Sequence, residues 1–457
     1  MIFAIGQQLV ALTVGLMFLL VMWYRPGWAV FAAISSAVLL DCLEVGTDGL
    51  NLGVNVYVDD LACLALLLTG VLLLIRYRKG VRKGIPPDAV PCVILLTLLV
   101  LSLSRGVSIF GLKQAGNGVR SLFAFTVPAL AIMLLRPVLR LDAGRLARWL
   151  GWAGSCFCAI ALLRWVGALP TPVSLQSDLR EVARTLNADP ALVVGQAFIA
   201  SIYLVIKERR RGWWWWAAAG MFGVVTLTLQ HRSVWVATAA GAVWLTFRTG
   251  RLSPVRWLAL GATAMVAFFF IMITDSAIME SVREIVGSDV SEMRSEHSTW
   301  AWRVQGYTEA TDRVFASGAV DLLLGPPAGW SANSEGSSAS IHIHGRYVET
   351  LAYNGFVGAS VLLVWFVVLI QRVRRRAHTP SKMQLLSRSS RALLQAILIS
   401  ELVYFIPYGG GILQSAVLGL VGIAASQWVF QQRGRRLVLV HARALCTADS
   451  AVLASQQ

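Results

Sequence analysis

The sequence predicts an all-α fold, a polytopic integral membrane helical bundle of about 12–13 transmembrane helices with one long, partly helical periplasmic loop. The first observation is composition: 56% of the 457 residues are hydrophobic and 14% are charged, whereas soluble domains carry about 25% charged residues. The second is patterning, because the apolar residues come in runs of roughly the twenty residues that cross a bilayer. A soluble domain with a single anchor is excluded.

The apolar runs give the predicted spans in chain order. The first run has no basic region before it and is followed by Arg25, which predicts an uncleaved helix with its N-terminus outside. The runs lie at 2–23, 27–40, 57–75, 89–104, 121–135, 149–169, 191–206, 213–228, 233–247, 257–274, 348–370, 391–406 and 412–430.

Charge is distributed unevenly between alternate loops. The net charge is +16, and most of the 40 Lys and Arg fall in every second loop, while most of the 24 Asp and Glu fall elsewhere. This is the positive-inside pattern, which predicts that the basic loops and the C-terminus are cytoplasmic. The cations there meet anionic headgroups of membrane lipids, so a nucleic-acid partner is not expected.

The same alternation divides the chain into four regions. They are the N-terminal transmembrane helices 1–274, a catalytic loop 275–347, the C-terminal transmembrane helices 348–430 and a cytoplasmic tail 431–457. The loop 275–347 is the one long polar interruption, and polar residues gathered at a membrane face are where aqueous chemistry is expected. In a bacterial inner membrane this loop would face the periplasm.

Arg232 is the most informative cation on the external side. It lies in LTLQHRSVW, between two apolar runs with almost no loop, so it is expected at or just below the membrane surface. A cation there is costly unless an anion or an aqueous cavity meets it; the alternative is snorkelling to headgroups. His231 and Gln230 add polar groups and favour a site. The other cations expected on this side are Arg105, Lys113, Arg120, Arg180, Arg184, Arg283, Arg294, Arg303, Arg313 and Arg346.

The segment STWAWRVQGYTEATDRVF predicts an amphipathic helix that lies against the membrane or caps a cavity. Four of its residues recur at helical spacing: Trp300, Arg303, Tyr307 and Thr311. Taken alone, Arg303 fits a solvated residue or a salt bridge to a neighbouring carboxylate such as Glu309 equally well.

The segment IHIHGRYVET carries the sharpest local signal. His342, His344 and Arg346 alternate before a helix that enters the bilayer, with Glu349 in its first turn as a potential orienting partner for a histidine. Histidine can take or give a proton near neutral pH, which suits a general base. Two histidines near one carboxylate can also bind zinc, but there is no H-E-x-x-H and no third close ligand, so no metal is expected.

The acidic pair Asp59–Asp60 opens the span 57–75 from the outside and has two interpretations. Paired carboxylates at the membrane edge can hold a divalent cation for a lipid-phosphate donor. They can equally cap a helix and interact with its dipole.

These segments resemble those of the bacterial O-antigen ligase and O-unit polymerase superfamily. LTLQHRSVWVATAAG is similar to the family's Ser/Thr-Arg-small-aromatic segment and puts Arg232 on its first arginine. TWAWRVQGYTEA is similar to the Arg-x-x-x-aromatic segment and puts Arg303 on the second. HGRYVETLAYNGFVG resembles the His-Asn-x-Tyr-Leu…Gly-x-x-Gly segment, except that Gly345 stands where the family usually has asparagine; the matching residues are His344, Tyr347, Gly355 and Gly358.

The resemblance implies an inner-membrane glycosyltransferase of lipopolysaccharide or polysaccharide biosynthesis. Its donor would be an undecaprenyl-diphosphate-linked glycan, its acceptor a hydroxyl of a lipid-borne saccharide, and it would need no metal or other cofactor. Arg232 and Arg303 would neutralise the leaving diphosphate, and His344 would be the general base. Second-rank candidates are His342, Arg346, Glu349 and His231.

Three functional alternatives stay open. A ligase uses lipid A–core as acceptor, whereas a polymerase uses a second polyprenyl-linked repeat unit. A transporter or flippase for lipid-linked glycans is the alternative of another class. The lack of a detectable inverted repeat and the gathering of polar residues in one external loop favour an enzyme.

Overall fold

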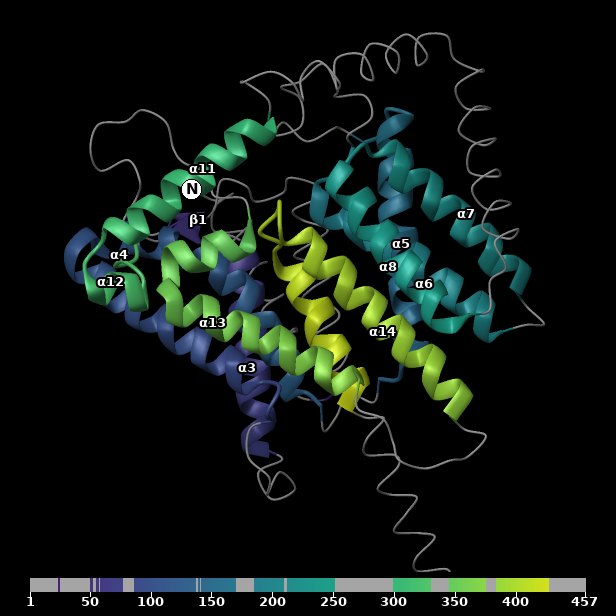
Figure 1. Ribbon diagram of the computed structural model, residues 1–457, viewed down its shortest axis with the longest axis horizontal. Helices are drawn as coiled ribbons and strands as arrows, with labels where there is room; N and C mark the ends of the chain where they lie inside the picture. Colours follow the sequence, from purple (N-terminus) through teal and green to yellow (C-terminus); the bar gives the residue numbers. More distant parts are fainter. Residues whose placement is uncertain are drawn as a thin grey trace, which may run out of the picture.

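The structure is a computed structural model of the 457-residue chain, and it is an assembly of α-helices (Figure 1). The described residues are 24, 50–51, 55–56, 58–76, 86–136, 139, 141–169, 185–208, 212–250, 299–329, 345–374 and 384–426. The predicted spans 2–23, 27–40 and 257–274 and the tail 431–457 therefore lie outside the described residues.

The all-α prediction is confirmed for the described part of the chain, in which the one exception is a pair of two-residue strands. These are β1 (Leu50–Asn51) and β2 (Asn55–Val56). The helices are α3 (Val58–Arg76), α4 (Val90–Leu134), α5 (Ala143–Trp165), α6 (Ala188–Lys207), α7 (Gly212–Thr228), α8 (Arg232–Thr249), α11 (Thr299–Ala316), α12 (Ala319–Leu324), α13 (Arg346–Arg374) and α14 (Gln384–Tyr404), followed by a shorter helix, Ile412–Ser426.

Four of the described helices, α4, α5, α6 and α13, are long and apolar enough to cross a membrane. This fits a membrane protein, and the bounds of α6, α7, α8 and α13 lie within four residues of the predicted apolar runs. The full number of spans and their sidedness stay predictions. The predicted loop 275–347 is helical in part, because it contains α11 and α12.

The stretch 105–120 was predicted to be a loop, and this was wrong: it is helical, and α4 runs through it. Gly111, with φ +80° and ψ 164°, is the break inside α4. Glycine adopts this left-handed conformation without the steric cost that a Cβ would bring. The two predicted spans 89–104 and 121–135 are thus the two arms of one broken helix.

The two arms fold back on each other at Gly111. A Cβ added to Gly106 would lie 1.9 Å from Ala328 O, and one added to Gly118 would lie 2.5 Å from Gly329 N. Both glycines therefore face the same peptide group, whereas a straight helix would hold them ~18 Å apart. The arms form a hairpin whose two ends lie at the same end of the bundle.

One buried carboxylate, that of Asp88, forms ion pairs that join the chain segments at that end. Asp88, 1% exposed, precedes α4 and lies 3.9 Å from the guanidinium of Arg136, which follows α4. It also pairs with Arg372 near the end of α13, and Arg372 Nη1 donates to Ser426 Oγ at 3.1 Å. We call this the Asp88 end of the bundle.

On the other side of the bundle, α14 packs along α8 in the antiparallel direction (Figure 1). Arg388 Nε, near the start of α14, donates to Arg248 O near the end of α8 at 3.0 Å. Further along, Trp244 Nε1 donates to Gln395 Oε1 at 3.1 Å. Continued at ~1.5 Å per residue, this register places the start of α8 at the level of the end of α14.

Aromatic side chains fill the space between α4, α13 and α14. Phe405, directly after α14, stacks on Phe366 with ring centres 5.9 Å apart and meets Phe125 edge-on at 5.4 Å. Phe125 in turn meets Trp365 at 5.8 Å. Pairs of this kind contribute about 0.5–1.5 kcal/mol each beyond their buried area, so the residue that begins the next loop is held firmly in the core.

Candidate functional site

The loop 405–411, with the sequence FIPYGGG, connects α14 to the Ile412–Ser426 helix, and we call it the hub loop. Tyr307 Oη of α11 donates to Ile406 O at 3.1 Å. Gln414 accepts from Gly411 N at 3.1 Å and donates to Asp189 O, in the first turn of α6, also at 3.1 Å. The hub loop therefore joins α6, α11 and α14 at the end of the bundle opposite Asp88.

Arg346 joins the start of α13 to the hub loop. Its side chain is fully buried; Nε donates to Gly409 O and Nη2 to Gly410 O, while Nη1 lies 2.9 Å from Glu349 Oε2. A buried charge is tolerated when it is paired and hydrogen-bonded in this way. Arg346 thus holds the fold together, and Glu349 has an arginine as partner where a histidine was predicted.

Arg303 has a different environment, although it also lies at this end. The predicted amphipathic helix is confirmed as α11, and the Arg303 guanidinium carbon lies 4.8 Å from the ring centre of Tyr408. Within the described residues Arg303 forms no hydrogen bond or ion pair, and its Nε is buried. The alternative of a salt bridge to Glu309 is not realised among the described residues, in which the Glu309 carboxylate accepts from Gln305 Nε2 at 2.8 Å.

Arg303 contacts the first of two stacked tyrosines, Tyr408 and Tyr404. The ring of Tyr408 lies on that of Tyr404, with centres 5.1 Å apart and planes 9° apart. Tyr404 is fully buried and donates its hydroxyl to Asp189 Oδ1 at the start of α6. A continuous column therefore runs from Asp189 through both tyrosines to the guanidinium of Arg303.

Tyr307, one helical turn after Arg303, faces the same loop. Burial raises the pKa of its phenol above the ordinary value, the Arg303 cation lowers it, and the neighbouring Tyr408 raises it further. The net direction is upward, so the hydroxyl stays protonated at neutral pH. It can therefore donate to Ile406 O as the geometry indicates.

Arg232 is the first residue of α8, and the predicted tight hairpin is confirmed, since α7 ends at Thr228. His231 is buried and its Nε2 lies 2.8 Å from Leu186 O, so the ring nitrogen donates to that carbonyl. His231 thereby holds the hairpin against the chain that leads into α6. The register between α8 and α14 places Arg232 at the level of the hub loop.

His342 and His344 lie outside the described residues, and the description resumes at Gly345. Gly345 is buried between the hub loop and α11: an added Cβ would lie 2.5 Å from Ile406 O and 2.9 Å from Tyr307 Oη. No side chain fits there without a shift of the backbone. This close packing explains why a glycine occupies position 345.

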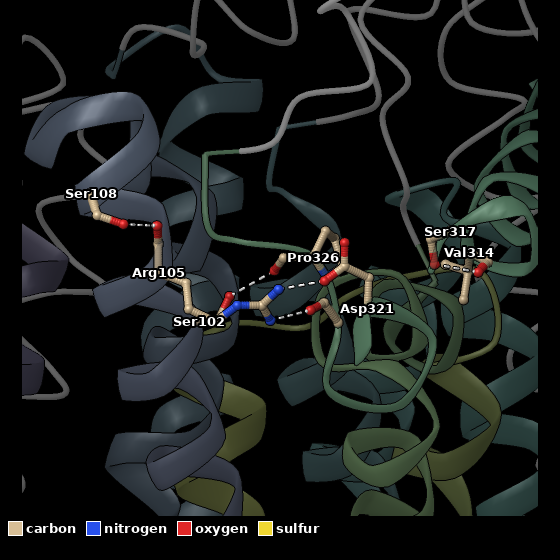
Figure 2. Close-up of polar contacts among 8 residues, drawn as sticks. Ser102, Arg105, Ser108, Val314, Ser317, Asp321 and Pro326 are labelled. Carbon is tan, nitrogen blue, oxygen red and sulfur yellow. Dashed lines mark hydrogen bonds and ion pairs between the residues drawn. The ribbon is translucent and has the colours of Figure 1, made fainter. Parts of the chain in front are cut away.

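Several cations predicted on the external side have structural partners. Arg105 points from α4 to α12, as Figure 2 shows, where it pairs with Asp321 and donates to Gly325 O at 2.9 Å. The neighbouring Ser102 hydroxyl donates to Pro326 O at 3.0 Å. Arg120 pairs with Asp60 at 3.2 Å, so one carboxylate of the Asp59–Asp60 pair already faces a cation; the side chain of Asp59 lies outside the described residues.

Two parts of this end were not predicted. Arg164, in the last turn of α5, is 6% exposed and donates to Thr185 O at 2.5 Å. The signal for it was a charge inside the apolar run 149–169, which is a functional hypothesis by default in a membrane span. The hub loop was also missed, although Pro-Tyr-Gly-Gly-Gly between two apolar runs is a strong turn signal.

Among the residues that the structure describes, no group of three or more His, Cys, Asp or Glu could hold a metal ion. Comparison with known proteins gives no independent assignment, because the chain matches no protein-family model and no curated protein. The resemblance to the O-antigen ligase superfamily therefore rests on the short segments quoted above, and function has to be argued from the site.

Proposed function

We propose that this protein is a membrane glycosyltransferase that uses an undecaprenyl-diphosphate-linked glycan as donor. The acceptor is a hydroxyl of a lipid-borne saccharide, as in an O-antigen ligase acting on lipid A–core. The reaction takes place on the periplasmic side of the bacterial inner membrane. Arg232 and Arg303 bind the diphosphate, and His344 is the general base.

The observation that carries the proposal is the state of the arginines at the hub-loop end. Arg346 and Arg105 donate to carbonyl oxygens and pair with carboxylates of the protein. Arg303 rests on an aromatic ring, and none of its N–H groups has a partner among the described residues. A guanidinium with free donors beside a membrane-spanning bundle is suited to the oxygens of a lipid diphosphate.

The chemistry follows from these roles. The acceptor hydroxyl oxygen attacks the anomeric carbon of the donor sugar, and the bond from that carbon to the diphosphate oxygen breaks. His344 takes the hydroxyl proton, and the negative charge that develops on the leaving polyprenyl diphosphate is stabilised by Arg232 and Arg303. Gly345, which follows His344 in the chain, lies against Tyr307 of the helix that carries Arg303.

Two other functions remain candidates for the same site. A repeat-unit polymerase would use a second polyprenyl-linked glycan as acceptor, with the same three residues in the same roles. A lipid-linked glycan transporter or flippase would bind the donor but form no new glycosidic bond. It would need the arginines but would depend little on a general base.

The test measures donor binding and product formation separately. Purified full-length protein is supplied with a fluorescent undecaprenyl-diphosphate oligosaccharide and either lipid A–core or a second donor molecule as acceptor. We expect His344→Ala to bind the donor normally and form no product, and Arg232→Ala and Arg303→Ala to bind it at least about tenfold more weakly, the size of one lost charge-assisted contact.

The matched control is Lys113→Ala, which removes an exposed cation at the same end of the bundle. It is expected to leave binding and transfer unchanged. If the protein translocates the donor, forms no product with either acceptor, and His344→Ala translocates the donor as well as wild type does, the transporter is favoured and the transferase is excluded. The acceptor that yields product separates ligase from polymerase.

A further inference from the structure

Arg303 needs a device that fixes its guanidinium without using its hydrogen-bond donors. A long arginine side chain loses considerable rotamer freedom when it binds a ligand, and this entropy weakens binding. Hydrogen bonds to the protein would fix the side chain but would also occupy the N–H groups that a phosphate must reach. An aromatic ring contacts the face of the guanidinium and leaves its edges free.

Tyr408 provides such a ring, 4.8 Å from the Arg303 guanidinium carbon. Its position is fixed on both sides along the chain. Pro407 precedes it and restricts the backbone, and the carbonyls of Gly409 and Gly410 accept from the buried Arg346. The ring therefore belongs to a rigid part of the bundle.

The Tyr408 ring also has an aromatic neighbour. Tyr404 stacks on it at 5.1 Å, and Asp189 holds Tyr404 through its hydroxyl. The column lies at the same level as Arg232, given the register between α8 and α14. The column brings together three distant parts of the chain, Asp189 of α6, Arg303 of α11 and the tyrosines at the end of α14 and in the hub loop, and this sets the level of Arg303 relative to the other proposed arginine.

We propose that Tyr408 is a positioning residue, which holds the Arg303 guanidinium by its face so that the guanidinium edge is presented to the donor diphosphate. This inference rests on the proposed function, because it assigns a role to a neighbour of the proposed diphosphate-binding residue. Tyr408 acts through Arg303, so its effect on binding disappears when Arg303 is absent.

The test is a double-mutant cycle on the full-length protein in nanodiscs, with radiolabelled undecaprenyl diphosphate as the probe. Tyr408→Leu is expected to weaken binding roughly fivefold, the effect of losing one partly exposed cation–π contact. Tyr408→Phe keeps the ring and is expected to stay within about twofold of wild type. In the Arg303→Ala background, Tyr408→Leu should cause less than about a twofold further loss.

Trp244→Leu is the matched control. It removes a contact of the same kind, between the Trp244 ring and Arg248 at 5.2 Å, near the Asp88 end of the bundle, and it should leave binding of the probe unchanged. If Tyr408→Leu weakens binding equally in both backgrounds, or not at all while Arg303→Ala does, the positioning role is overturned and the proposed function stands. If Arg303→Ala itself binds the probe like wild type, the diphosphate site is wrong, and the proposed function fails together with this inference.

Discussion

Gly345, directly before α13, lies close to the hub loop. Adding a methyl group at this position therefore tests the packing between α13 and the hub loop. In Gly345→Ala the new Cβ would be 2.5 Å from the backbone oxygen of Ile406, so the loop must move. We expect the free energy of unfolding to fall by about 1–3 kcal/mol, the usual cost of overpacking. Thermal unfolding of the purified protein measures this.

Gly220→Ala is the control for that substitution, because a Cβ at Gly220 would meet nothing within 4 Å. Alanine in a helix interior is, if anything, favourable, so this variant should unfold at or slightly above the wild-type temperature. A Gly345→Ala protein as stable as Gly220→Ala would contradict the close contact between α13 and the hub loop.

Tyr307 gives a pH dependence whose sign follows from its raised pKa. Burial, the largest cause, raises the pKa of this phenol above about 10 in the folded protein. The unfolded chain therefore ionises first, and the stability that the group contributes is complete below about pH 10 and falls as the pH rises further. We expect Tyr307→Phe to cost about 1 kcal/mol at pH 7–9, the net value of its hydrogen bond.

Above pH 10 the difference in unfolding temperature between wild type and Tyr307→Phe should narrow, because only wild type loses stability through this phenol. Unfolding temperatures measured from pH 7 to pH 11 check it. A difference that stays constant over this range would show that folding does not raise the pKa of the Tyr307 phenol.

At the scale of single residues, the local sequence around each cation did not show which arginines the fold pairs internally. Arg303 and Arg346 have the same side chain, and both lie near the start of a helix. What separates them is burial and the carbonyls of a loop more than sixty residues from Arg346. Such partners depend on tertiary packing, which no local pattern in the sequence contains.

At the scale of elements, the contact between α4 and α12 can be tested at Arg105. Arg105→Ala removes an ion pair with Asp321 that is about one-third exposed and a hydrogen bond to Gly325 O. Because exposed ion pairs contribute little, we expect a loss of about 1 kcal/mol in unfolding free energy. Arg105→Lys should lose most of the same unfolding free energy, since lysine lacks the planar guanidinium that reaches both Asp321 and Gly325 O.

Salt distinguishes the two contributions. The part of the loss that comes from the ion pair with Asp321 should shrink at high ionic strength, whereas the part from the Gly325 carbonyl should not. Urea unfolding of wild type and Arg105→Ala at low and high salt measures both. Equal stability of the two proteins at low salt would contradict the contact shown in Figure 2.

The elements show where sequence reasoning succeeds. The apolar runs predicted α5–α8, α13 and α14 to within a few residues at most ends, because lipid exposure imposes long hydrophobic stretches. They failed at 105–120, where a polar stretch inside α4 was taken for a loop although its residues pack on the segment 325–329. The kink at Gly355 in α13, with φ +60°, was likewise invisible to a hydropathy pattern.

At the scale of the whole molecule, the predicted sidedness is testable with two exposed lysines. Lys113 lies beside the break in α4, at the hub-loop end, and Lys207 ends α6 at the opposite end. In a cysteine-free background, we expect Lys113→Cys to react with a membrane-impermeant maleimide in spheroplasts. Lys207→Cys should react after the membrane is permeabilised, because the basic loops are predicted to be cytoplasmic.

Each of the two positions serves as the control for the other. Labelling of Lys207→Cys in intact spheroplasts, with Lys113→Cys protected, would reverse the topology. The hub loop and its arginines would then face the cytoplasm, and the proposed periplasmic site would have to be abandoned.

The segment that holds the α4 hairpin closed has a consequence for the way the chain is made. Ser102 of α4 donates to Pro326 O of the segment that follows α12, and these two residues are 224 positions apart in the chain. Ribosomes add about 5–20 residues per second. The end of α4 at Leu134 precedes Pro326 by 192 residues, so the whole hairpin is synthesised roughly 10 to 40 seconds before the segment that packs on it. During that interval Gly106 and Gly118 lack the Ala328–Gly329 peptide that packs against both of them in the folded protein.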